Sequence, residues 1–117
     1  MLPTDSAYER VVHKVWGREL WLTNRAEFCA KVLVVNPGFR SSRHYHMTKA
    51  EEFIVLDGTV RLDLVDGSRE MRPGERQFLP PGTAHRFGSV AGAMLLEIST
   101  YHDDADVVRL EPSGPLP

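Results

Sequence analysis

The positions of the turn residues constrain the fold most. Eight prolines and nine glycines fall mainly between short apolar runs, where they mark turns and leave no long periodic segment for a helix. The runs are rich in β-branched and aromatic residues, which favour strands. They occupy residues 31–35, 52–56, 59–65, 76–80 and 93–99. This placement of turn residues between short apolar runs predicts an all-β protein.

Details within the runs agree with strands that have one buried face. Residues 60–64 (VRLDL) alternate apolar with charged side chains, which is the period of a half-buried strand. Asp-Gly pairs at 57–58 and 66–67 favour tight hairpins. A small domain with many short antiparallel strands must protect its sheet edges, and a closed barrel or two-sheet jelly roll does so.

The two ends of the chain are expected to differ from each other. Residues 11–22 (VVHKVWGRELWL) have an extended pattern in which the two tryptophans serve as apolar anchors. The tail from about residue 112 contains prolines that donate no hydrogen bonds to a sheet. We therefore expect an extended N-terminal region and a loose C-terminal tail.

Length and charge limit the function classes. The 117 residues suffice for one domain, 1–117, with one core. The net charge of −2 arises without a basic stripe, so neither nucleic acid nor an acidic membrane is an expected partner. Cys29 is the lone cysteine, and the N-terminus lacks the apolar core of a signal peptide. These features, with no run long enough to span a membrane, predict a soluble, cytoplasmic protein.

Residues 43–53 (RHYHMTKAEEF) hold a pair of histidines followed by two glutamates. On a helix, His44 and His46 would point about 200° apart, whereas on a strand they share a face with α-carbons roughly 7 Å apart. A shared ligand therefore implies a strand. Imidazole and carboxylate together suit borderline divalent metals. A turn at 47–50 would return Glu51 or Glu52 to the same face; alternatively, the pair is an ordinary set of hydrogen-bonded polar residues.

Two longer stretches resemble the motifs of the cupin superfamily. In residues 38–58, five residues separate a glycine from the His-x-His pair, four lead on to a glutamate, and six more to a second glycine. In residues 74–89, a glycine is followed by Pro-x-Gly and, two residues later, by a histidine. Nine fixed positions of the two cupin motifs are matched in order: Gly38, His44, His46, Glu51, Gly58, Gly74, Pro80, Gly82 and His85.

This resemblance implies a fold and a metal site. Cupins are double-stranded β-helices, or jelly-roll β-barrels, and their motif residues bind one divalent metal. The implied ligands are His44, His46, Glu51 and His85, and the metal could be zinc, iron, manganese or nickel. The resemblance favours Glu51 over Glu52 as the carboxylate ligand. Ser89 stands where the second motif usually has asparagine, which affects a turn and no ligand.

The chain also resembles the cupin module of mannose-6-phosphate isomerases. Residues 14–24 (KVWGRELWLTN), 30–38 (AKVLVVNPG) and the ending around 97–114 are similar to that module. Two positions depart from it: His44 replaces the usual glutamine, and Val15 replaces the proline before Trp-Gly. The departure at His44 changes the ligand field, so isomerase activity is not transferred directly.

Three function classes are compatible with this site. The first is a metal-dependent isomerase or epimerase of a sugar or sugar phosphate. The others are an iron-dependent dioxygenase, for which three histidines and a glutamate are suitable ligands, and a non-catalytic binder of a small metabolite. By similarity to cupins, a homodimer is expected.

Residues beyond the metal ligands are weaker candidates. Glu97, Tyr101 and His102 are the candidate acids or bases for moving a proton between neighbouring carbons. Lys31 and Arg86 are candidates for binding an anionic group of the substrate, with ordinary surface charges as the alternative.

Overall fold

The computed structural model describes residues 7–117 and consists almost entirely of strands, turns and loops in that range, with no α-helix. None of its elements is therefore a helix able to cross a membrane. The strands are β1 (Arg10–Lys14), β2 (Gly17–Asn24), β3 (Cys29–Val35), β4 (Phe39–Arg40), β5 (Arg43–Tyr45), β6 (Glu51–Gly58), β7 (Val60–Leu64), β8 (Gly67–Met71), β9 (Arg76–Leu79), β10 (Arg86–Ser89), β11 (Ala93–Ser99), β12 (Val108–Glu111) and β13 (Gly114–Pro115).

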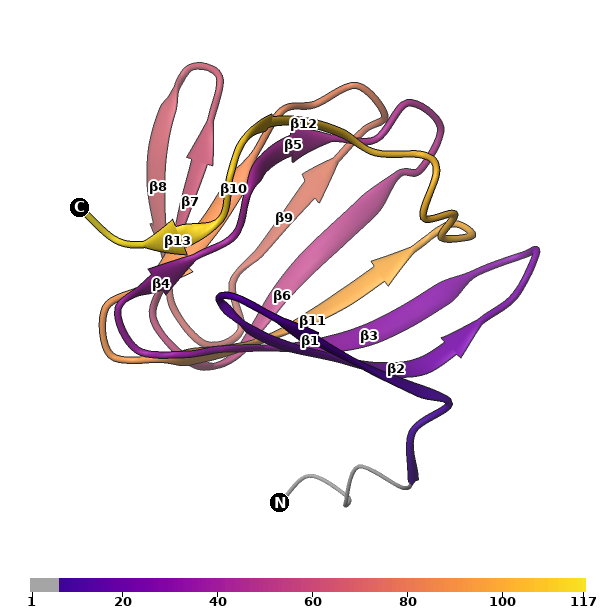
Figure 1. Ribbon diagram of the computed structural model, residues 1–117, viewed down its shortest axis with the longest axis horizontal. Helices are drawn as coiled ribbons and strands as arrows, with labels where there is room; N and C mark the ends of the chain where they lie inside the picture. The colour runs from indigo at the N-terminus through magenta and orange to yellow at the C-terminus, as the bar shows by residue number, and fades with distance from the viewer. Residues whose placement is uncertain (1–6) are drawn as a thin grey trace.

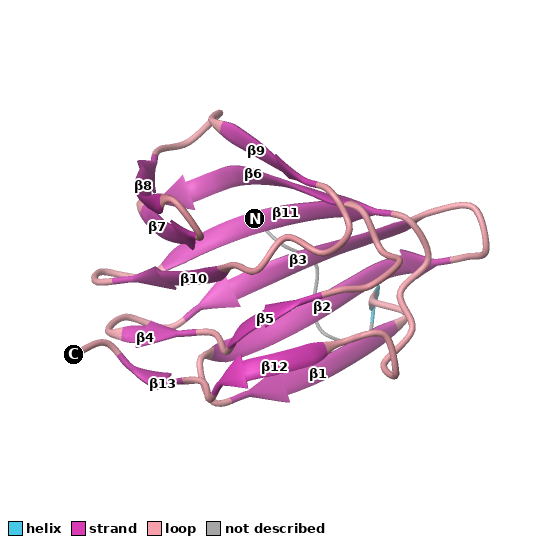
Figure 2. Ribbon diagram, turned by 90° about the horizontal axis from the view of Figure 1, so that it is seen from above, coloured by secondary structure: helices cyan, strands magenta, loops and turns pink. Residues whose placement is uncertain are grey.

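Two antiparallel sheets form the body of the barrel (Figure 1). One sheet has six strands in the order β1-β2-β3-β11-β6-β9, and the other has five in the order β13-β4-β10-β7-β8. A short β12-β5 ribbon lies beside them (Figure 2). The order mixes strands from distant parts of the sequence, as a jelly roll requires. The expected all-β jelly-roll barrel is confirmed.

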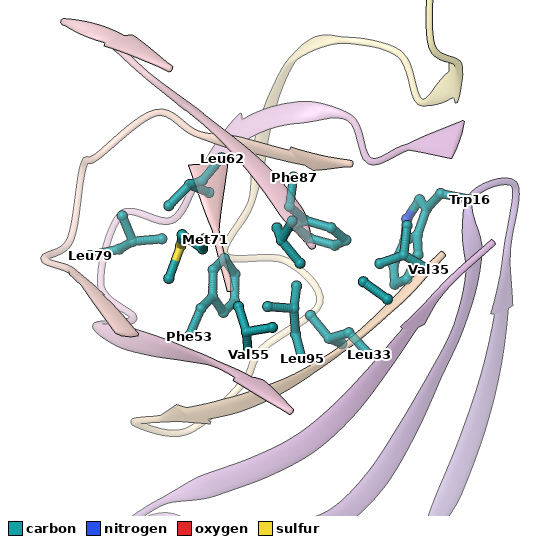
Figure 3. Packing of buried hydrophobic residues seen from close by; sticks show 12 residues of the cluster. Trp16, Leu33, Val35, Phe53, Val55, Leu62, Met71, Leu79, Phe87 and Leu95 are labelled. Carbon is teal, nitrogen blue, oxygen red and sulfur yellow. The ribbon is translucent and has the colours of Figure 1, made fainter. Parts of the chain in front are cut away.

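The core lies between the two sheets and is filled mainly by inward-facing residues of β3, β6, β7 and β11, together with Trp16, Met71, Leu79 and Phe87 (Figure 3). Along β6, Glu51, Phe53 and Val55 are all buried, while the residues between them are more exposed. This period of two places Glu51 on the same inward face as the core residues. Phe53 contacts Phe87 edge-to-face, with ring centroids 5.6 Å apart. The hydrophobic core therefore ends directly at the carboxylate predicted to bind metal.

The C-terminal tail is attached to the barrel, which corrects the expectation of a loose end. β13 pairs with β4 and forms the edge of the five-stranded sheet, and the amide of Leu116 donates to the carbonyl of Gly38 at 2.8 Å. The buried Arg86 guanidinium donates to the carbonyls of Ser41 and Pro112, at 2.9 and 2.8 Å. The prolines are tolerated because this is a sheet edge, where one side of the strand needs no donors.

Gly58 and Ser89, two motif positions that are not metal ligands, have structural roles in turns. Gly58 has a φ of +76°, and a β-carbon there would collide with the backbone of Gly92 and Ala93, so only glycine fits. Ser89, in place of the usual asparagine, donates its hydroxyl to the carbonyl of Thr59 at 2.7 Å. The turn is thus held by a different donor.

Candidate metal centre

The two sequence motifs meet through their backbones. His44 lies in β5, and His85 immediately precedes β10. The amide of His44 donates to the carbonyl of His85 at 3.0 Å, and the amide of His85 donates back at 2.9 Å. This isolated antiparallel bridge places two imidazoles, separated by 40 residues of sequence, side by side with ring centroids 4.6 Å apart.

The structure brings all four predicted ligands together. One ring nitrogen from each of His44, His46 and His85 lies within 4.8 Å of the others. Glu51 approaches this group from β6, with one carboxylate oxygen 3.3 Å from His46 Nε2 and the other 3.7 Å from His85 Nε2. Three imidazoles and one carboxylate form the nitrogen and oxygen donor set that borderline divalent metals accept.

The hydrogen bonds of the imidazoles fix which nitrogen is free. The Nδ1 atom of His44 lies 2.9 Å from the Ser42 carbonyl, that of His46 lies 2.7 Å from the Asp106 carbonyl, and that of His85 lies 2.8 Å from the Thr83 carbonyl. A carbonyl oxygen can only accept, so each Nδ1 carries the hydrogen and each Nε2 keeps its lone pair. Backbone carbonyls orient metal-binding histidines in this way in known sites.

The Nε2 atom of His85 tests whether the site suits a cation. It is buried, and no residue in the range 7–117 forms a hydrogen bond with it. A buried acceptor without a partner is costly, and a divalent metal between this nitrogen and Glu51 would supply the missing interaction. The residues present therefore fit a metal ion.

Burial keeps the imidazoles neutral, as metal ligands must be. Desolvation, assisted by the neighbouring His85, lowers the pKa of His44 to about 3. Desolvation and the charge of Lys49 lower the pKa of His46 to about 4. Burial also lowers the pKa of His85. All three are ready to coordinate at neutral pH without first losing a proton.

The metal-free protein should lose stability on acidification. The unfolded histidines titrate near 6.5, whereas folded His44 and His46 titrate at about 3 and about 4. Between these values the unfolded chain binds more protons, so stability falls as pH decreases from about 6.5. Burial raises the pKa of Glu51, so protonation of this one group stabilises the folded protein as the pH falls. The combined effect of the three histidines, whose pKa values are lowered, is larger. Urea unfolding with a chelator at pH 7 and pH 5 should show a lower midpoint at pH 5; an equal or higher midpoint would contradict it.

The turn between His46 and Glu51 wraps around the carboxylate of Asp106. This carboxylate accepts hydrogen bonds from the amides of Met47, Thr48 and Lys49 and from the Thr48 hydroxyl, at 2.7 to 3.2 Å. The main-chain carbonyl of Asp106 is also the acceptor for His46. Sequence reasoning missed Asp106 because it lies about sixty positions from His46 and outside both motifs; its only signal was the acidic run before β12.

Replacing Asp106 with alanine should weaken metal binding without removing a ligand. The turn between His46 and Glu51 would lose the carboxylate that accepts its hydrogen bonds. The two ligands would then no longer be held in fixed positions relative to each other. Partners that orient metal ligands change affinity by about 10- to 100-fold, and we expect a loss in that range for zinc, measured by competition with a chromogenic chelator. Asp103→Ala, in the same loop, is the matched control. Equal zinc affinity in the two variants would contradict this role.

A second charged cluster lies beside the metal ligands. The Lys49 ammonium donates to Glu97 at 3.0 Å, lies 3.0 Å from Nδ1 of His102, and is 3.8 Å from Glu51. The opposite ring nitrogen of His102 lies 2.9 Å from the Asp104 carboxylate, which makes that nitrogen the donor and leaves Nδ1 to accept from Lys49. Two of the predicted acid or base residues are thus joined by a lysine that the sequence analysis did not single out.

The surroundings of the two inward glutamates shift their pKa values in opposite directions. Burial alone would raise the pKa of Glu97, but Lys49 and Lys31 outweigh it and hold that pKa low. Burial and the neighbouring Glu97 raise the pKa of Glu51. Two carboxylates with opposed shifts in one site can take different protonation states, which is a frequent arrangement in acid–base catalysis.

The three remaining predicted residues, Lys31, Tyr101 and Arg86, lie in different places relative to the cavity. Lys31 lies inside the barrel with 1% of its surface exposed, 4.1 Å above the Trp21 ring. Tyr101 is half exposed and does not line the cavity at the metal centre. Arg86 is also absent from that lining, because its guanidinium is engaged by the tail carbonyls described above. The structure thus gives Arg86 a role in holding the tail and places Tyr101 outside the site.

The cavity at the metal centre has a volume of about 330 Å³, which is within the range of small-ligand sites. Its wall includes His44, His46 and Glu51, and its interior includes Lys31 and Glu97. Exposed residues of β1 and β12 also belong to the lining, so the cavity reaches solvent between these two strands.

Comparisons with known proteins agree with this fold. The mannose-1-phosphate guanylyltransferase RfbM of Salmonella typhimurium is 29% identical over 104 residues, covering 86% of this chain and 22% of that protein. The alginate biosynthesis protein AlgA of Pseudomonas aeruginosa is 29% identical over 105 residues, with the same coverage of 86% and 22%. The chain therefore spans about a fifth of the length of these curated relatives.

Solved structures give the same picture. A cupin-superfamily sugar phosphate isomerase from Silicibacter pomeroyi is 25% identical, with a TM-score of 0.67 over 86% of this chain and 80% of that one. Oxalate decarboxylase from Bacillus subtilis has a TM-score of 0.77 over 86% of this chain and 30% of that one, and at 18% identity it shows the fold alone.

A family model for the C-terminal region of mannose-6-phosphate isomerase matches residues 4–112, nearly the whole chain. Together with the barrel and the two joined motifs, this match shows that the chain is a cupin belonging to the mannose-6-phosphate isomerase C-terminal family.

Proposed function

We propose that the protein binds one divalent metal at His44, His46, Glu51 and His85 and acts as an isomerase or epimerase of a sugar or sugar phosphate. The observation that carries the proposal is the set of three imidazoles, each anchored through Nδ1, with the partnerless Nε2 of buried His85 facing Glu51. Zinc, iron, manganese and nickel all suit this donor set.

The side chains next to the metal ligands supply what such a reaction needs. A bound divalent metal polarises carbonyl and hydroxyl oxygens as a Lewis acid. Isomerisation also requires a group that moves a proton between neighbouring carbons. Glu97 and His102 both line the cavity and both contact the Lys49 ammonium, so a proton can be held among these three groups. Glu97, kept ionised by the lysines, is the proposed base.

Turnover assays test this function. The protein loaded with each of the four metals is incubated with paired aldose and ketose phosphates, including mannose 6-phosphate, and interconversion is followed by NMR. We expect turnover with at least one metal that falls to background in His85→Ala. Ligand-induced thermal stabilisation without any product would contradict the isomerase and identify a non-catalytic binder.

An iron-dependent dioxygenase is the second candidate, and His44 is the residue that favours it. The related isomerase modules usually have glutamine there, whereas this chain places a third imidazole beside the glutamate. Three nitrogen donors with one carboxylate also suit iron. Oxygen consumption that depends on iron and is not supported by zinc would establish this alternative.

We also propose that the protein is a homodimer. Leu56, Phe78 and Ile98 expose 43%, 54% and 45% of their surface on the outer face of the six-stranded sheet. Exposed apolar side chains grouped on one face favour association. Sedimentation equilibrium is expected to give twice the chain mass of 13.2 kDa, and the single-chain mass at micromolar concentration would contradict the dimer.

A further inference from the structure

We propose that Lys14 and Arg109, together with Arg10, form a binding site for a doubly charged oxyanion at the cavity mouth, which receives the phosphoryl group of the substrate. The proposal deepens the proposed function by assigning the substrate class and the end of the substrate that lies outermost. It replaces Lys31 and Arg86, which the sequence suggested for this role.

The three cations reach the cavity from two opposite strands. Arg10, Val12 and Lys14 alternate along β1 and line the cavity, since residues two apart on a strand share a face. Arg109 lies in β12, directly opposite the metal-site residue His44 in the β12–β5 ladder. In Figure 1, β1 lies below and the β12–β5 ribbon above. The basic residues thus lie on both sides of the route to the metal ligands.

The deeper cations of the cavity are already compensated. Lys49 pairs with Glu97 at 3.0 Å, and Lys31 lies 3.8 Å from Glu19 and over the Trp21 ring. These lysines are almost fully buried, so an unpaired negative group there would compete with existing carboxylates. The interior is therefore not where an additional anion is accommodated.

Among the described residues that line the cavity, those with uncompensated positive charge lie nearer the solvent. Arg10 is shared between Asp104, at 3.4 Å, and the face of Trp21. The side chains of Lys14 and Arg109 form no hydrogen bond or ion pair with any residue in the range 7–117. Two free cations at one opening attract anions, and the attraction is stronger because the cavity walls exclude water.

The chemistry of these side chains favours a phosphoryl group. Guanidinium donates through a planar fork that matches phosphate oxygens, and lysine adds a point charge. A dianion can satisfy both cations at once, whereas one carboxylate has a single charge to share. With the phosphoryl group at the mouth, the sugar carbons extend inward to the face that holds His44, Glu97 and the other site residues.

Binding of inorganic phosphate tests the site without requiring turnover. Isothermal titration at low, fixed ionic strength compares the zinc-loaded protein with Lys14→Met, Arg109→Met and the double variant. We expect each single variant to bind phosphate about 10- to 100-fold more weakly, as hydrogen bonds to charged groups imply, and the double variant to show no measurable binding. Arg72→Met is the matched control, since Arg72 is exposed and outside the cavity lining.

Further measurements distinguish phosphate binding by these cations from phosphate binding by the metal. Arg109→Lys keeps the charge and should retain most of the affinity, and acetate should bind far more weakly than phosphate. Phosphate binding that is unchanged in the double variant, or that disappears only when a chelator removes the metal, would overturn the proposal. If phosphate binding depends on both cations but no sugar phosphate is converted, the anion site stands and only the isomerase is refuted.

Discussion

Alanine substitutions at Glu51 and His44 are each expected to leave the purified protein without stoichiometric metal. Among residues 7–117, Glu51 is the only carboxylate in contact with the imidazole cluster, 3.3 Å from His46 and 3.7 Å from His85. Its removal leaves three neutral nitrogen donors and no charge to balance a dication in a buried site. Removal of His44 opens the imidazole cluster on the side of β12. We expect at least a 100-fold loss of metal affinity in each case, which corresponds to about 3 kcal/mol.

The chain offers a matched control for this experiment. Glu52 is the next residue along β6, but its side chain points to the other face, where it lies 3.9 Å from Arg76. Glu52→Ala should therefore keep its metal, as measured by elemental analysis of protein purified under the same conditions. Full metal content in Glu51→Ala and His44→Ala would refute the ligand assignment and leave the histidines as hydrogen-bonded polar residues.

The long strands were predictable because the residues that favour them lie within the strands or in the turns beside them. The apolar run 93–99 coincides with β11, and the run 76–80 nearly coincides with β9. Their β-branched residues and flanking turns act within a few positions. The short strands β4 and β13 were not predicted, since pairing with a distant partner defines them. The tail illustrates the difference: its prolines indicate a poor strand, yet Arg86 and the edge of β4 hold it in place.

The candidate site was predictable to the extent that motifs encode it. The two motifs correctly grouped His44, His46, Glu51 and His85 in space, and the strand period placed Glu51 on the inward face. Neither signal could identify Lys49 or Asp106. Lysine and aspartate are usually exposed, and only the fold shows that one is buried against Glu97 and the other organises a turn.

The Lys49→Met substitution should destabilise the protein more than any change at its surface. Lys49 and Glu97 have side chains that are 2% and 6% exposed, and their charged atoms are 3.0 Å apart. Burial alone would lower the pKa of Lys49, but Glu97 and Glu51 outweigh it and raise that pKa, while the pKa of Glu97 is held low, so both groups are charged at neutral pH. Removing the lysine leaves a buried carboxylate without its partner, which costs about 3–5 kcal/mol. Urea unfolding in the presence of a chelator measures this cost independently of metal affinity.

Two comparisons distinguish an ion-pair effect from a packing effect. Lys49→Met combined with Glu97→Gln removes both charges and should recover most of the lost stability, because replacing a buried pair with neutral groups is often nearly neutral in free energy. Arg61→Met breaks the ion pair with Asp63, whose members are 63% and 22% exposed at 3.0 Å, and should cost about 1 kcal/mol or less. A double variant as unstable as Lys49→Met alone would mean that the lysine stabilises the barrel through its packed methylene chain, because the charge of Glu97 would then make no difference.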